Sequence, residues 1–193
     1  MAARPSARED ERLARLAGYR ILGTPPEPVF DDLVRRAQEA LHAPMAWLSF
    51  HDGQREWVKA GIGIGFKDLP GRRSLVFGAG FPTGFVEIED ARESPLAAHG
   101  LVAGDPRVRF LAVAPLSTND GHALGALVVA DRVPRRLQPP ERTAFENLAT
   151  LAMARLEARL GAGPEVDALA AAHRTEELED LLAKEREFTE AVI

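Results

Sequence analysis

Apolar residues recur along the first part of the chain at helical spacing. From Phe30 to Leu41 they fall every three or four positions, which predicts an amphipathic helix that Pro44 ends. Residues 6–19 hold two leucines among charged residues and predict a shorter helix before it. The intervening stretch GTPPEP, at 23–28, contains adjacent prolines, which cannot continue a helix. We therefore expect two separate helices ahead of the first strand.

The pattern then changes to that of strands. Residues 45–60 and 108–130 each contain two apolar runs around an Asp-Gly pair, at 52–53 and 120–121. Asp-Gly accepts the positive φ angles of a tight turn, so each stretch predicts an antiparallel hairpin. The nearly continuous apolar run ALGALVVA in the second hairpin predicts a central strand covered on both faces.

A further helical stripe follows adjacent prolines that suit a first helical turn. Its apolar members are Phe145, Leu148, Leu151, Ala152, Leu156 and Leu160. The order is therefore helix, hairpin, an irregular Gly- and Phe-rich segment, hairpin and helix. Hairpins imply an antiparallel sheet with helices on one side, which is an α+β fold.

The last part of the chain predicts a third helical run after the breaker GAGP at 161–164. An a/d-like seven-residue pattern favours a coiled coil, with a solvated helix as the alternative; its members are Leu178, Leu181, Phe188 and Val192. Glu165 to Glu190 carries nine acidic and three basic residues, whereas the whole chain has a formal net charge of −5. The acidity therefore belongs to this tail, and because the chain ends without a capping signal we expect it to stop within a helix.

Composition excludes several kinds of chemistry. The chain has no cysteine, which rules out disulfides, thiolate nucleophiles, Cys-ligated metals and thioether-attached cofactors. The charge balance argues against general affinity for nucleic acid, which needs a basic face. An apolar run long enough for a membrane span is absent, and the charged N-terminus lacks the core of a signal peptide, so we expect a cytoplasmic protein.

Several spaced stretches resemble the GAF family of sensory domains. YRILGTPPEPVFDDLVRRAQEALHAPMAWLSFHDGQREWVKAGIG is similar to the opening helix and first hairpin of the family, and DPRVRFLAVAPLSTNDGHALGALVVADRVPRRL to its second hairpin. The similarity is greatest to the subgroup that precedes bacterial histidine kinases and cyclic-dinucleotide enzymes. It implies about six antiparallel strands, with terminal helices on one face and a variable segment roofing a ligand cavity on the other. We expect a helix at 1–22, the GAF domain at 23–160 and a truncated signalling helix or coiled-coil linker at 161–193.

The stretch SLVFGAGFPTGFVEIEDA, at 74–91, falls where the resemblance places the cavity wall. Its GxGxxxG spacing superficially matches a dinucleotide loop, but the residues that follow are strand-like and acidic rather than helical. Its rings predict either a secondary core or an aromatic-lined pocket. We expect Phe77, Phe81, Phe85 and Phe110 in one apolar cluster. Relatives commonly carry a Phe-Cys-x-His-like element here, which this chain lacks, so chemistry attached to that element is in doubt.

Three polar residues near this wall are further candidates for ligand contact. Asp90 and Arg92 lie where relatives point side chains at ligand, with a solvated ion pair as the alternative. His99 could reach a cofactor such as haem, with a loop or buried structural histidine as the alternative. The five histidines show no i, i+3 or i, i+4 pair for a metal site. No acid–base or nucleophilic set emerges, so we expect no catalysis.

These observations predict a non-catalytic sensory GAF domain of a bacterial signal-transduction protein. It would bind a small molecule or partner and relay the signal through its C-terminal helix to an output domain absent from this chain. We expect a homodimer, formed through Leu148, Leu156, Leu160, Leu178, Leu181 and Phe188. The alternative is a degenerate GAF domain that only spaces and dimerises, and a third reading is a haem or metal sensor through His99.

Overall fold

The computed structural model of the chain describes residues 7–78 and 80–161. Within them, six strands form one sheet in the order β3-β2-β1-β6-β5-β4, and every neighbouring pair is antiparallel. The strands are β1 Met45–His51, β2 Arg55–Ile62, β3 Asp68–Pro70, β4 Val86–Ile88, β5 Phe110–Ser117 and β6 Ala123–Asp131. The helices are α1 Ala7–Gly18, α2 Pro28–Ala40, α3 Gly100–Ala103 and α4 Pro139–Gly161, with short 3-10 turns at Gly71–Arg73 and Ala91–Glu93. The predicted α+β fold with an antiparallel sheet is confirmed.

Both hairpins turn where the Asp-Gly pairs lie. Gly53 and Gly121 have φ angles of 92° and 82°, in the left-handed region that glycine adopts without strain. The Asp52 carboxylate accepts hydrogen bonds from the backbone amides of Gln54 and Arg55, which fixes the first turn. These local features bring β1 against β2 and β5 against β6.

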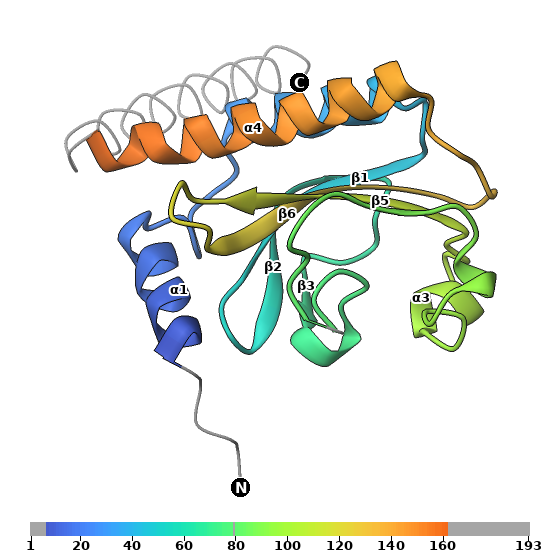
Figure 1. Cartoon of the computed structure of the whole chain (residues 1–193), viewed down its shortest axis with the longest axis horizontal. Helices are drawn as coiled ribbons and strands as arrows, with labels where there is room; N and C mark the ends of the chain where they lie inside the picture. Colours follow the sequence, from blue (N-terminus) through green and yellow to red (C-terminus); the bar gives the residue numbers. More distant parts are fainter. Residues whose placement is uncertain (1–6, 79, 162–193) are drawn as a thin grey trace, which may run out of the picture. The chain divides into compact units, whose positions relative to one another are not determined.

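Helices α2 and α4 cover one face of the sheet (Figure 1). We call the apolar layer beneath them the helix-side core; among its members are Phe30, Leu33, Leu48, Phe50, Phe110, Leu127 and Phe145. Helix α2 begins at a proline, which needs no amide hydrogen bond at that position, and buries its apolar stripe there. The part of α4 up to Leu156 completes this layer, which the predicted stripe anticipated.

Parts of residues 64–108 cover the opposite face of the sheet (Figure 1). We call this range, apart from residue 79, the cover segment; it also contains the edge strands β3 and β4. The layer between the sheet and this segment is the cover-side core, and it includes Met45, Trp47, Leu75, Val76, Phe77, Val102, Leu111 and Val128. Strand β6 lies between β1 and β5 and is buried on both faces, as its continuous apolar run predicts. A side chain at Gly125 would meet the backbone oxygen of Ser49 at 2.1 Å, so only glycine allows β6 this close to β1.

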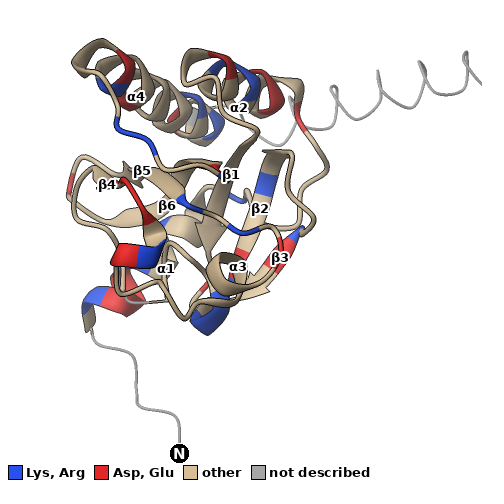
Figure 2. Cartoon of the chain, turned by 90° about the vertical axis from the view of Figure 1, so that its right-hand side faces the viewer, with Lys and Arg blue, Asp and Glu red and all other residues tan. Residues whose placement is uncertain are grey.

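The chain divides into two units, Met1–Leu156 and Glu157–Ile193. The first holds the sheet, both cores and the helices up to Leu156, while only the end of α4 is described in the second. Figure 2 shows charged residues on helices, loops and strand β2, whereas β1 has none. None of the helices described here has the length and apolar character needed to cross a membrane.

Candidate functional site

The four phenylalanines expected in one cluster divide between the two cores. Phe77 is buried in the cover-side core and Phe81 packs against it, with ring centroids 5.0 Å apart. Phe110 is fully buried in the helix-side core, and Phe85 packs against that core. The expectation of a single cluster is therefore wrong.

Strand alternation explains the division. Phe110 begins β5, whose next residue Leu111 faces the opposite core, so one residue decides the face. Phe85 directly precedes β4, and its ring meets that of Phe145 on α4 at 6.3 Å, edge to face. Of the four rings, only Phe77 and Phe81 can contribute to a site on the cover side of the sheet.

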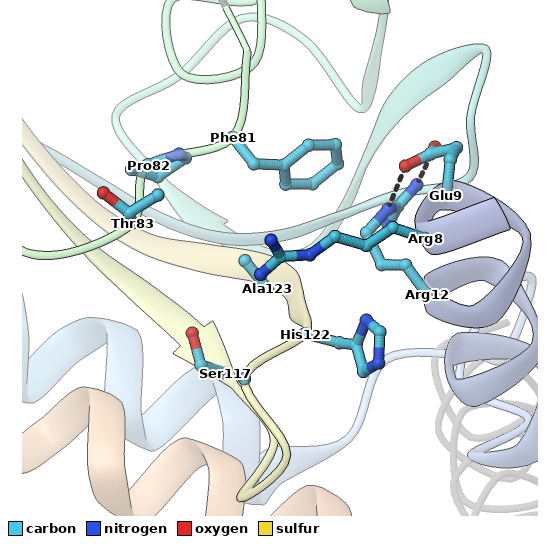
Figure 3. A pocket seen from close by; sticks show the side chains of 10 residues that line it. Arg8, Glu9, Arg12, Phe81, Pro82, Thr83, Ser117, His122 and Ala123 are labelled. Atoms are coloured by element: carbon cyan, nitrogen blue, oxygen red, sulfur yellow. Dashed lines mark hydrogen bonds and ion pairs between the residues drawn. The ribbon is translucent and has the colours of Figure 1, made fainter. Parts of the chain in front are cut away.

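A cavity of about 440 Å³ lies beside Phe81, between α1, the cover segment and the β5–β6 turn (Figure 3). We call it the edge cavity; it is lined by Arg8, Glu9, Arg12, Phe81, Pro82, Thr83, Ser117, Gly121, His122 and Ala123. Its volume falls in the lower part of the range of small-molecule sites, about 300–1,000 Å³. Phe81 is the one predicted ligand-contact residue in this lining.

Arg12 fixes α1 to the rest of the domain and is only 4% exposed. Its Nη1 donates to the backbone oxygen of His51 at 2.7 Å, and its Nε and Nη2 donate to the Glu9 carboxylate at 2.8 and 2.7 Å. The guanidinium also lies 4.2 Å from the centre of the Phe81 ring. The hydrogen bond to Arg12 lowers the pKa of Glu9, so this carboxylate stays ionised and balances the buried charge.

Behind Phe81 lies a buried polar layer that sequence reasoning missed. The His51 ring lies 5.2 and 5.3 Å from the rings of Phe77 and Phe81, and burial, reinforced by the nearby Arg12 charge, lowers its pKa. Its register partner Glu56 is fully buried, and one carboxylate oxygen accepts from Trp47 Nε1 at 2.8 Å and Ser49 Oγ at 2.6 Å. The other oxygen has no hydrogen-bond partner. Alternation in β2 gave no signal for this burial, because apolar Trp57 on one face makes Glu56 resemble a solvent-facing residue of the other.

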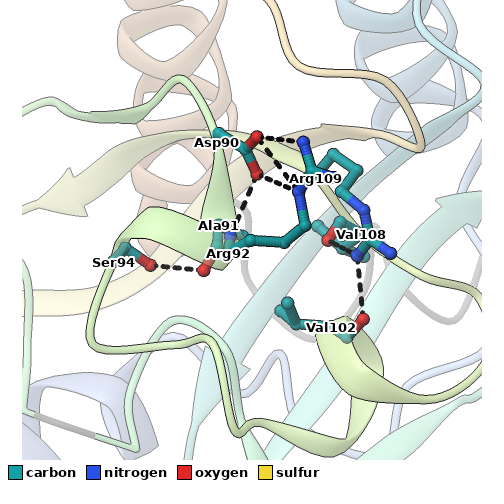
Figure 4. A network of polar contacts seen from close by, with 7 residues as sticks. All are labelled: Asp90, Ala91, Arg92, Ser94, Val102, Val108 and Arg109. Atoms are coloured by element: carbon teal, nitrogen blue, oxygen red, sulfur yellow. Dashed lines mark hydrogen bonds and ion pairs between the residues drawn. The ribbon is translucent and has the colours of Figure 1, made fainter.

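Asp90 and Arg92 form the ion pair that was the alternative to ligand contact (Figure 4). Arg92 Nε donates to the two carboxylate oxygens at 3.0 and 3.1 Å, and the Arg92 backbone amide donates as well. The side-chain hydrogen bond from Arg92 lowers the pKa of Asp90 to about 2. Arg109 Nη1, close by, donates to the backbone oxygens of Val102 and Val108. The pair thus caps a turn of the cover segment, away from the edge cavity lining.

His99 has both ring nitrogens engaged. Nδ1 accepts from the Leu101 amide at 3.2 Å at the start of α3, and Nε2 lies 3.1 Å from the Arg73 backbone oxygen. This pairing makes His99 a link between α3 and the turn at Arg73. Among the residues the structure describes, no group of three or more His, Cys, Asp or Glu could hold a metal ion.

The leucines expected at a dimer interface differ in exposure. Leu156 is fully buried in the helix-side core, so it offers no surface to a second chain, and Leu148 packs partly against the same core. Leu160 and Leu151 are 59% and 39% exposed. The stripe of Leu178, Leu181 and Phe188 lies outside the described residues.

The open antiparallel sheet, with helices on one face and a covering segment on the other, defines an α+β domain architecture. The family model described as GAF domain matches residues 25–156, and the chain belongs to the GAF domain family. The match begins after α1, although α1 supplies three residues of the edge cavity.

A cyclic di-GMP phosphodiesterase of Pseudomonas aeruginosa is 36% identical over 158 residues, which is 80% of this chain. The chain spans 27% of that relative. Two solved structures share the fold at low identity. The PixJ GAF domain of Thermosynechococcus elongatus, in its blue-light absorbing form, superposes with a TM-score of 0.57 at 18% identity, over 88% of this chain and 98% of that one. The free methionine-R-sulfoxide reductase of Neisseria meningitidis gives 0.58 at 17%, over 84% and 97%.

Proposed function

We propose that this chain is the ligand-sensing input module of a larger signalling protein and performs no catalysis itself. The observation that carries the proposal is the edge cavity, which touches α1, the cover segment and the β5–β6 turn together. A molecule bound there would contact elements from three parts of the chain. Its binding energy could therefore favour one arrangement of these elements over another.

The length of the phosphodiesterase relative supports the proposal that this chain is part of a larger protein. That relative is named as a cyclic di-GMP phosphodiesterase, and this chain corresponds to about a quarter of it. We propose that the output domain of the parent protein is an enzyme of cyclic-dinucleotide signalling. Helix α4 and the residues after it would relay the signal, and exposed Leu151 and Leu160 would join two copies.

The absence of cysteine underlies the proposal that the module is not an enzyme. One neighbour of this fold is a methionine sulfoxide reductase, and the resemblance implies that this branch of the family works through cysteines. The present chain has none. Catalytic turnover that disappears when a polar residue of the edge cavity is substituted, in a protein that still folds, would contradict this part of the proposal.

A second candidate function is that of a dimerising spacer. Leu75, Val76 and Phe77 of the cover segment are buried against the sheet, so the protein's own side chains occupy the face where the resemblance places a ligand. A spacer would retain the fold and the dimer but bind nothing in the edge cavity.

Native mass spectrometry of the 193-residue chain, purified from cell extract, distinguishes the two. The sensor predicts a small molecule bound to each chain, whereas the spacer predicts none. Ala123→Phe adds a ring to the cavity lining and should remove the bound mass, while Ala103→Phe, on the exposed face of short α3, should retain it. Absence of any bound mass, even after incubation with a concentrated small-molecule fraction, would favour the spacer.

A further inference from the structure

One wall of the edge cavity is formed by α1, which lies outside the residues that match the family. The family match starts at residue 25, yet Arg8, Glu9 and Arg12 of α1 line the cavity. Arg12 holds that wall in place through the backbone of β1 and the face of Phe81. Helix α1 is therefore a fixed part of the site and lies outside the segment that defines the family.

The charges in the lining leave one cation available. Arg12 is neutralised by two hydrogen bonds to Glu9. His122 lies 3.8 Å from Glu11 and 4.0 Å from Asp120, and Asp120 is also paired with Arg15. Arg8 has no ion pair with any residue the structure describes. Figure 3 shows its side chain reaching across the cavity toward Ala123, with Phe81 on one side and His122 on the other.

The rest of the lining provides an apolar surface beside this cation. Phe81, Pro82 and Ala123 contribute a ring, a pyrrolidine and a methyl group. The Phe81 ring is held on its other sides by Phe77, His51 and Arg12, so it presents a fixed face. A cationic ligand would be repelled by Arg8, whereas an acid group would give Arg8 the ion pair that it lacks among the described residues.

We infer that the edge cavity takes a small organic anion, whose acid group pairs with Arg8 and whose apolar part lies on Phe81. The inference rests on the proposed sensory function and names the ligand class for that site. Helix α1 becomes a ligand-binding element, because it supplies the residue that recognises the charge.

Three probes of similar shape and different charge test the inference: benzoate, benzamide and benzamidine. Each is titrated into the full 193-residue chain at constant ionic strength, while amide resonances are followed by NMR. For a ligand of this size, dissociation constants on the order of 1–10 mM are expected. Benzoate should shift the amides of Phe81, Gly121 and Ala123 saturably, and it should bind at least about fivefold more tightly than benzamide or benzamidine.

Arg8→Gln should remove this preference, so that benzoate binds about as weakly as benzamide. The matched control is Arg36→Gln, which removes an exposed arginine of α2 that pairs with Asp32 and should leave benzoate binding unchanged. Equal affinities for the three probes in the unaltered chain would overturn the inference, as would benzoate shifts confined to other surfaces or an absence of saturable binding. None of these outcomes decides whether native mass spectrometry finds a bound molecule. The proposed ligand class can therefore be wrong while the proposed sensory function stands.

Discussion

Glu56 illustrates how one residue within the cover-side core depends on its neighbours. A buried carboxylate is costly unless its oxygens receive hydrogen bonds, and here Trp47 and Ser49 both donate to one oxygen while the other has no partner. Removing either donor should therefore lower the free energy of unfolding more than removing an average surface hydrogen bond.

Ser49→Ala should lower the free energy of unfolding by about 1–3 kcal/mol, because it removes one of the two donors to a buried carboxylate. Ser117→Ala provides the control, since Ser117 is exposed at the end of strand β5 and should change stability by less than about 0.5 kcal/mol. Urea denaturation of both variants measures the difference. Equal, small effects would show that the Ser49 hydroxyl contributes little to holding Glu56.

His51 makes stability depend on pH near neutrality. Its pKa is lowered in the folded protein, mainly by burial, so the unfolded chain takes up a proton at higher pH than the folded one. The contribution of neutral His51 is present above its ordinary pKa of 6.5 and is lost as pH falls through the lower folded value. The free energy of unfolding should therefore be smaller at pH 5.5 than at pH 7.5. His51→Gln should reduce that difference, and an unchanged difference would assign the pH dependence to other groups.

Among the elements, α1 is attached by few contacts, and Arg12 provides the most specific of them. Arg12→Ala removes the hydrogen bonds to His51 and Glu9 and leaves the Phe81 face uncovered. Losing the buried hydrogen bond to His51 and the partly buried ion pair with Glu9 should lower the free energy of unfolding by roughly 1–3 kcal/mol. Hydrogen exchange should accelerate across α1 while the central strands β1 and β6 stay protected.

Arg15→Ala is the matched control within the same helix. Arg15 is 59% exposed and pairs with Asp120 at the surface, so its loss should leave exchange in α1 nearly unchanged. If both variants release α1 equally, the buried contacts of Arg12 are not what hold the helix.

The elements were predictable from sequence to the extent that their signals are local. Asp-Gly pairs located both hairpin turns, and the three- to four-residue stripes located α2 and α4. Phe85 was assigned to the wrong core because β4 is only three residues long and gives too little alternation to reveal which face its neighbour takes. The edge cavity was missed because it joins α1 to Phe81 and the β5–β6 turn, and no local pattern relates residues so distant along the chain.

At the scale of the whole molecule, the exposed leucines of α4 lead us to expect that two copies of the chain associate. Leu151→Glu places a charge on an exposed apolar position and should weaken a homodimer at least about tenfold. Val133→Glu adds the same charge at a 58% exposed position in the loop before α4 and should leave association unchanged. Analytical ultracentrifugation of the full chain measures both. A monomer in the unaltered chain at micromolar concentration and moderate salt would contradict the dimer itself.

The position of α1 also couples two equilibria. Helix α1 forms one wall of the edge cavity. A partner that binds α1 and changes its position against the sheet would therefore change the affinity of the cavity for a bound molecule. Thermodynamic reciprocity then requires that molecule to change the affinity for the partner by the same factor. If the edge cavity binds a molecule as proposed, its occupancy and the attachment of a partner to α1 would share one coupling free energy, so binding at either place would change the affinity at the other.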